Sequence, residues 1–118
     1  MEKAIVFYKT RGKDQDEINQ RQQTINEFIS KKGWQLSKVV HDLEEFKGEL
    51  LSGDYQYSVL YNTTDIRDFM ERTHVYIINI RQGMKIYSAF LDMDITPAHL
   101  RKKFGVKLST NNEDQRKN

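Results

Sequence analysis

The sequence contains no cysteine, one proline and six glycines in 118 residues. Without cysteine, the chain has no disulfide, no thiolate nucleophile and no zinc ribbon. It also lacks any apolar run near the roughly 20 residues that a membrane-spanning helix needs. A polar stretch, residues 9–23, follows the first short apolar run, and this pattern does not fit a signal peptide. We therefore expect a protein of the cytoplasm with no membrane partner.

The composition is sufficient for one folded domain. Hydrophobic residues make up 37% of the chain and charged residues 31%, and a chain of this length normally builds a single core. We predict one domain over residues 1–108. Residues 109–118 are polar and without aromatics, and we predict that they form a disordered tail.

Glycine and proline fall where the hydrophobic pattern changes, so they delimit the predicted elements. Strands are predicted over residues 3–8, 34–41 and 55–61, and helices over 14–32 and 43–53. Thr63 or Thr64 is predicted to cap a short helix that buries Ile66, Phe69 and Met70. Two further strands, 75–80 and 84–90, are predicted to form a hairpin through residues 81–83. Thr96 is predicted to cap a last helix, with Pro97 in its first position and Gly105 at its end.

The predicted order is β-α-β-α-β-α-β-β-α. This alternation indicates a three-layer α/β fold with a mainly parallel sheet of about five strands and an antiparallel edge. Functional residues in such sheets gather beyond the carboxyl ends of the strands. The segments to search are residues 9–13, 41–45, 62–68 and 81–83.

Several kinds of site are not favoured by the residues in these segments. The first strand is followed by a segment with one glycine, whereas a phosphate-binding loop needs several. His41, His74 and His99 are too far apart in the sequence to form a local pair of metal ligands. Two carboxylates, Asp92 and Asp94, make a weak cation site without further oxygens. We expect neither a metal nor a cofactor.

Charge is unevenly distributed along the chain, although its formal net value is only +2. Residues 42–54 carry five acids and one lysine. The cations Arg101, Lys102, Lys103 and Lys107 lie close together with no acid between them. These four residues are our candidates for contact with DNA phosphates. The alternative is that they are solvated charges that complement the dipole of their own helix.

Several segments together resemble the N-terminal catalytic domain of serine recombinases, the resolvase/invertase family. The resemblance covers residues 3–104. The segment Val6-Phe-Tyr-Lys-Thr-Arg-Gly12 is similar to the family's Tyr-x-Arg-x-Ser motif, and a glutamine-rich helix follows it. Lys32-Gly-Trp34 is similar to the turn before the second strand. The stretch that contains Asp65-Ile-Arg67 is similar to the family's Leu-Asp-Arg-Leu-x-Arg.

The resemblance implies a resolvase-like fold and candidate residues for phosphate contact. Tyr8 matches the family tyrosine, Thr10 stands where the phosphate-binding arginine belongs, and Gly12 stands where the nucleophilic serine belongs. Arg11 takes the arginine's place after a shift of one residue, and Arg67 is the arginine of the second motif. The family's serine attacks a DNA phosphodiester, so a glycine at this position implies loss of the covalent intermediate.

Two interpretations follow. The first is a catalytically inactive recombinase-like domain, a pseudoenzyme that serves as a regulatory module on double-stranded DNA, on a protein or on a second copy of itself. The alternative is a small α/β enzyme that acts on a phosphate-containing substrate through Tyr8, Arg11 and Arg67. A third possibility is a protein of a mobile element whose acidic segment binds a partner without contacting DNA.

Overall fold

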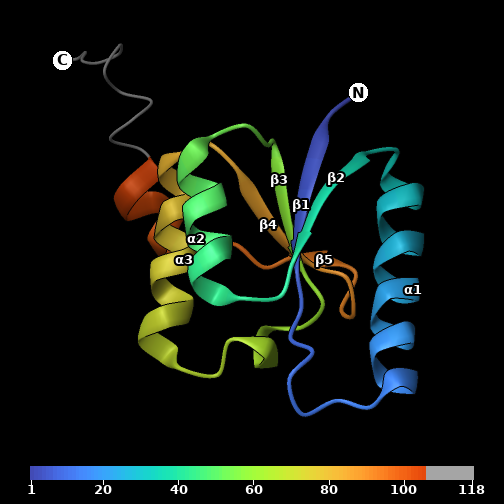
Figure 1. Cartoon of the computed structure of the whole chain (residues 1–118). Coiled ribbons are helices and arrows are strands. Elements are labelled where there is room, and N and C mark those ends of the chain that lie inside the picture. Colours follow the sequence, from blue (N-terminus) through green and yellow to red (C-terminus); the bar gives the residue numbers. More distant parts are fainter. Residues whose placement is uncertain (106–118) are drawn as a thin grey trace, which may run out of the picture.

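Strands and helices alternate along the chain in the order β1, α1, β2, α2, β3, α3, β4, β5 and α4 (Figure 1). The structure, a computed structural model, describes residues 1–105. The strands are β1 (Lys3–Phe7), β2 (Gln35–Val40), β3 (Tyr57–Leu60), β4 (Lys85–Ser88) and β5 (Met93–Asp94). The helices are α1 (Gln15–Lys32), α2 (Leu43–Ser52), α3 (Phe69–Arg81) and α4 (Ala98–Leu100), with a 3-10 turn η1 (Thr63–Asp65) and a π-helical turn η2 (Arg101–Gly105).

The five strands form one sheet in the order β2-β1-β3-β4-β5. The first four strands are parallel, and β5 pairs antiparallel with β4. The predicted α/β class, with a mainly parallel sheet and an antiparallel edge, is confirmed. The chain reverses its direction of strand addition after β2, so right-handed crossovers must place α1 on one face and α2 and α3 on the other. Figure 1 shows this arrangement.

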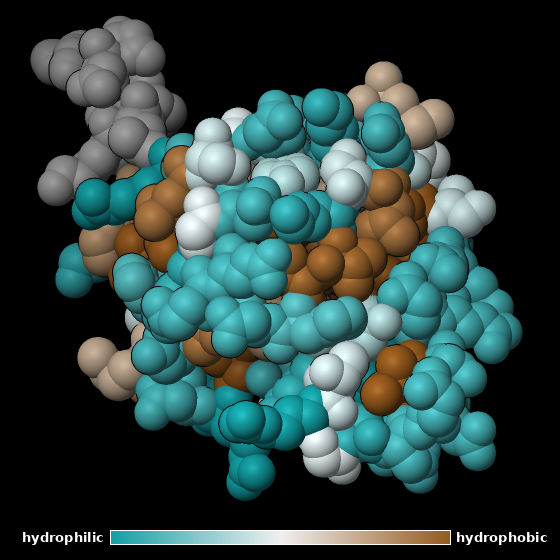
Figure 2. Space-filling view, in the orientation of Figure 1, coloured by the Kyte–Doolittle hydropathy of each residue, from teal (hydrophilic) through white to brown (hydrophobic). Residues whose placement is uncertain are grey.

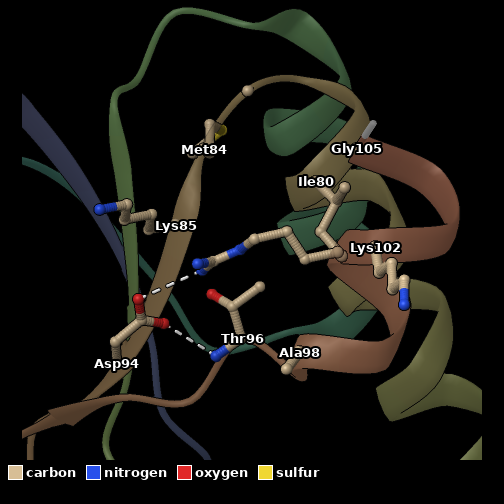
Figure 3. A pocket seen from close by; sticks show the side chains of 10 residues that line it. Ile80, Met84, Lys85, Asp94, Thr96, Ala98, Lys102 and Gly105 are labelled. Carbon is tan, nitrogen blue, oxygen red and sulfur yellow. Dashed lines mark hydrogen bonds and ion pairs between the residues drawn. The ribbon is translucent and has the colours of Figure 1, made fainter. Parts of the chain in front are cut away.

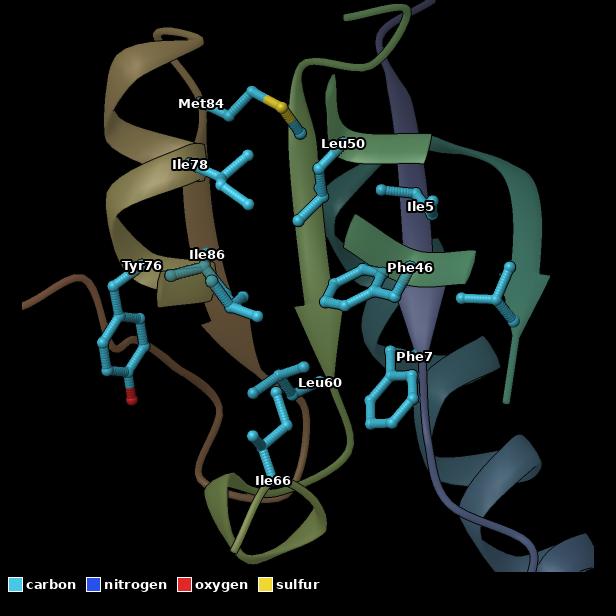
Figure 4. Packing of buried hydrophobic residues seen from close by; sticks show 12 residues of the cluster. Ile5, Phe7, Phe46, Leu50, Leu60, Ile66, Tyr76, Ile78, Met84 and Ile86 are labelled. Atoms are coloured by element: carbon cyan, nitrogen blue, oxygen red, sulfur yellow. The ribbon is translucent and has the colours of Figure 1, made fainter. Parts of the chain in front are cut away.

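Successive side chains of β1 point to opposite faces of the sheet, so the buried core is divided into two clusters. Ile5 and Phe7 belong to the cluster on the side of α2 and α3, where Phe7 stacks on Phe46 at 5.2 Å between ring centroids (Figure 4). Ala4, Val6 and Tyr8 belong to the cluster beneath α1. Both clusters are buried, as expected for a central strand covered on both faces.

Helix α1 has the ends that its sequence predicts. The Asp14 side chain accepts a hydrogen bond from the Glu17 backbone N–H at 2.9 Å, and the Glu17 side chain accepts one from the Asp14 N–H at 3.3 Å. This capping box satisfies two N–H groups that the first turn leaves free. Gly33 ends the helix with φ of 76°, a left-handed conformation that favours glycine.

The predicted short helix after β3 and the predicted strand over residues 75–80 are both wrong. Thr63 and Thr64 lie in η1, whose side chains provide no cap. Ile66 is buried, as predicted, but Phe69 and Met70 are exposed and begin α3, which is capped by Asp68 and runs through residues 75–80. Val75, Tyr76, Ile78 and Ile80 are buried, so this helix has no narrow apolar stripe for a sequence pattern to detect.

The predicted hairpin over residues 75–90 is therefore also wrong, because residues 81–83 connect α3 to β4. The antiparallel edge comes from β5, which pairs Tyr87 with Asp94 and Ser88 with Met93. The predicted cap at Thr96 is wrong as well. Its hydroxyl oxygen accepts a hydrogen bond from the Ile86 N–H at 3.2 Å, and Pro97 precedes α4 as its N-cap residue. The π-helical turn η2 runs over Arg101–Gly105, and Gly105 is the last of the described residues.

Hydrophilic residues cover most of the face seen in Figure 2, and hydrophobic ones gather between α1 and α2, where edge strand β2 lies in Figure 1. Lys38 on β2 forms ion pairs with Glu45 at 4.0 Å and Glu49 at 3.5 Å. A lysine on an edge strand opposes pairing with another strand. Among residues 1–105, no helix is long and apolar enough to cross a membrane.

Candidate functional site

A cavity of about 510 Å³ lies at the carboxyl edge of the sheet, between the loop after β1 and the loop after β3. These two strands are neighbours, and the crossovers from them lead to opposite faces of the sheet. Ligands of open α/β sheets bind at this kind of position. Its lining residues, hereafter the basic cavity, are Lys9, Lys13, Thr64, Asp65, Arg67 and Arg72.

Asp65 is the carboxylate of the basic cavity and is almost fully buried. One guanidinium nitrogen of Arg21, on α1, donates to both Asp65 oxygens, at 3.0 Å and 2.9 Å. The Lys9 backbone N–H donates to the same carboxylate at 3.3 Å. Arg21 also lies over the Tyr61 ring, with Cζ 4.2 Å from its centroid. The loops after β1 and β3 and helix α1 are therefore joined at one charged pair.

Burial raises the pKa of Asp65 above 3.8, against the opposing effects of Arg21, the Lys9 N–H and Lys13. The guanidinium of Arg21 nevertheless lies at hydrogen-bond distance from this carboxylate and is its ion-pair partner. Asp65 is therefore committed to a structural pair, and it leaves little negative charge to neutralise the other cations of the cavity.

Four cationic side chains line the basic cavity besides that pair. Within residues 1–105, none of Lys9, Lys13, Arg67 and Arg72 forms an ion pair. Arg72 is held in place, because Nη1 donates to the Ile66 carbonyl at 2.7 Å. Like charges that converge without counter-charges are unfavourable on their own, and a bound anion relieves that repulsion. The site has the chemistry of a phosphate receptor.

The structure separates the four phosphate-contact candidates predicted from sequence. Arg67 lines the basic cavity. Tyr8 is buried beneath α1, where its hydroxyl donates to Gln22 Oε1 at 2.6 Å and its ring contacts His41. Thr10 is half-buried and accepts a backbone bond from Lys13, and Arg11 is exposed; neither lines the cavity.

Gly12 occupies the turn after β1 with φ of 78°. A side chain is strained in this backbone conformation, so glycine suits the turn better than the serine of the resembling family. Thr64 is the hydroxyl residue that lines the basic cavity, and no histidine lines it. Since Asp65 is paired with Arg21, Thr64 has no free base among the lining residues to activate it.

Sequence reasoning selected the two loops of the cavity but missed most of its side chains. Lys9, Lys13, Thr64 and Asp65 all lie in the segments selected for search. Arg21 did carry a signal that was overlooked. It follows Ile18 by three positions and precedes Ile25 by four, so it belongs to the apolar face of α1. A charged residue on such a face indicates a buried partner.

The terminal cations occupy a different region from the basic cavity. Arg101, Lys102 and Lys103 are exposed on η2, which packs against α3, and Lys107 lies outside the described residues. Arg101 pairs with Asp94 at 3.3 Å. The acidic segment over residues 42–54 is partly neutralised, because Lys3 pairs with Asp54 and Lys38 with Glu45 and Glu49.

No group of three or more His, Asp or Glu side chains gathers to hold a metal ion in the part of the chain that the structure describes. No protein-family model matches the sequence, and a search of curated proteins found no match either. The case for a function therefore depends on the geometry and charge of the basic cavity.

Proposed function

We propose that this chain is a non-catalytic, recombinase-like domain that binds double-stranded DNA by holding a backbone phosphate in the basic cavity. The observation that carries the proposal is the convergence of Lys9, Lys13, Arg67 and Arg72 without a free counter-charge. The resemblance to serine recombinases supports DNA as the source of the phosphate. Glycine at position 12 supports binding without strand cleavage.

The alternative of an enzyme on a phosphate-containing substrate has less support. Thr64 lacks an adjacent base, and Tyr8 donates its hydroxyl to Gln22 away from the cavity. Arginine and lysine donors without a nucleophile bind a phosphate but do not cleave its ester. The acidic segment also supports a partner site less well, since lysines of β1 and β2 pair with its acids.

The test compares two arginines that differ in their relation to the cavity. Arg67→Gln removes a lining cation, and Arg11→Gln removes an exposed cation from the neighbouring loop. Binding of a fluorescent duplex is followed by anisotropy over a range of salt concentrations. We expect Arg67→Gln to weaken binding and to reduce the slope of log K against log salt by about 0.9, the value for one lost phosphate contact. Arg11→Gln should change the slope much less.

Two results would overturn the proposal: no duplex binding by the wild-type chain at low salt, or equal losses in the two variants. Turnover of a phosphodiester that Thr64→Ala abolishes would favour the enzyme instead. Circular dichroism of both variants checks that the fold is retained.

A further inference from the structure

A second cavity, of about 820 Å³, lies between the end of α3, the start of β4 and the terminal segment formed by α4 and η2 (Figure 3). It is near the amino end of β4, whereas the basic cavity lies beyond carboxyl ends of strands. Its volume is within the range of cavities that bind small molecules, roughly 300–1,000 Å³. The two cavities have no lining residue in common.

The lining of this second cavity is apolar at its base. Ile80 and Met84 are buried core residues that border it. Gly83 and Gly105 add no side chains, so the space between α3 and η2 stays open. A Cβ on Gly105 would lie 3.4 Å from Ile80 Cγ2, which shows how closely the π-helical turn approaches α3. Short π-helical segments are rare and occur often at functional sites.

A fixed guanidinium supplies the polar group of the cavity. Asp94 accepts a hydrogen bond from the Thr96 N–H at 2.8 Å, and Arg101 Nη2 donates to the other Asp94 oxygen at 3.3 Å. The Arg101–Asp94 contact joins η2 to β5, and Figure 3 shows Asp94 with its two contacts as dashed lines. The pair uses one N–H group of a guanidinium that has five. Within residues 1–105 its side chain forms no other hydrogen bond.

The charges around the cavity favour an anion. Lys85, Arg101 and Lys102 line it with a single carboxylate, Asp94, which is already paired. A ligand with one anionic group and an apolar body satisfies both parts of the lining.

We infer that this cavity binds a small amphipathic carboxylate, whose aliphatic or aromatic body packs on Ile80 and Met84 and whose carboxylate accepts hydrogen bonds from Arg101. This binding is independent of the proposed function, because the basic cavity contributes nothing to it. Arg101 then acts in ligand binding and not as a DNA contact.

The experiment titrates the full chain with octanoate by isothermal calorimetry. Octanamide has the same alkyl chain without the charge, and we expect it to bind about tenfold more weakly, the scale of one charge-assisted hydrogen bond. Hexanoate should also bind about tenfold more weakly, since each buried methylene contributes up to about fourfold.

The matched variants are Arg101→Gln and Lys103→Gln, which remove one positive charge each from η2. Lys103 does not line the cavity. We expect Arg101→Gln to lower octanoate affinity about tenfold and Lys103→Gln to leave it unchanged. The inference is wrong if octanoate gives no saturable binding to the wild-type chain, if octanamide binds equally well, or if both variants lose the same affinity. The ligand comparison needs no variant, so it stands even if a substitution unfolds the chain.

Discussion

Asp65 joins three segments of the chain through one carboxylate. It follows β3, it accepts the Lys9 N–H after β1, and it pairs with Arg21 of α1. The side chains of both partners are largely buried, at 3% exposed for Asp65 and 12% for Arg21. Removal of one member of a buried pair leaves the other charge desolvated and uncompensated, which costs far more than loss of a surface pair.

We therefore predict that Arg21→Gln, which leaves the Asp65 carboxylate buried without its partner, destabilises the protein by about 3–5 kcal/mol, the range for breaking a buried ion pair. Lys31→Gln is the matched control, because Lys31 pairs with Asp92 while both side chains are largely exposed. Such pairs contribute little to stability. Urea unfolding followed by circular dichroism measures both changes. Similar losses of stability in the two variants would contradict the assignment of Asp65–Arg21 as a buried pair.

The contribution of Asp65 to the stability of the protein depends on pH. Burial raises the pKa of Asp65 above its ordinary 3.8 despite the effect of Arg21. Between these two pKa values the native state holds the proton while the unfolded chain has lost it. The contribution of this group to stability is therefore largest below the unfolded pKa and decreases as the pH rises toward the native pKa.

At the scale of elements, α3 shows what a sequence pattern misses. Its segment His74–Ile80 is rich in β-branched and aromatic residues, which favour strands. In the structure this helix packs against the sheet, α2 and η2, so most of its surface in this region is buried and its apolar residues show no period of 3.6. The sequence signal for the start of this helix was Asp68, an N-cap residue type. Its side chain accepts a hydrogen bond from the Glu71 N–H at 2.9 Å.

This assignment predicts that Asp68→Ala destabilises the protein by about 1 kcal/mol, the usual cost of losing an N-cap. Asp16→Ala serves as the control, because Asp16 lies in the first turn of α1 but is not its cap. Thermal unfolding by circular dichroism compares the two. No effect of Asp68→Ala, or an equal effect of both substitutions, would show that Asp68 does not cap α3.

Helices with a capping residue at each end could be predicted from the sequence. For the site, the sequence predicted the loops that form it but not the side chains that meet there. Helices α1 and α2 each lie between an aspartate cap and a left-handed glycine. The direction of Tyr8 was not predicted, although its strand contains the signal: Tyr8 has the same parity as Ala4 and Val6 and so turns toward α1. The distances that bring Arg72 and Lys13 to one cavity depend on tertiary packing, which no local pattern contains.

At the scale of the whole molecule, charge that looks polarised along the sequence is redistributed by folding. Lysines from β1 and β2 pair with acids of the segment 42–54, and Asp94 pairs with Arg101. The cations left without ion pairs among residues 1–105 include the four of the basic cavity, which come from segments distant in sequence. Two exposed lysines, Lys102 and Lys103, remain on η2.

Substitutions in the basic cavity and on η2 should affect DNA binding differently. Lys13→Gln with Arg67→Gln, and Lys102→Gln with Lys103→Gln, each remove two positive charges, so the change in net charge is the same. If a duplex phosphate sits in the basic cavity, the first pair reduces the slope of log K against log salt by about 1.8, at about 0.9 for each lost contact. The second pair reduces it less, because Lys102 and Lys103 lie on η2 near the amino end of β4, away from the loops of the cavity. Anisotropy titrations of one labelled duplex with both double variants measure the difference. A larger change for the η2 pair would place the DNA surface on the terminal helix and leave the basic cavity without a role in DNA binding.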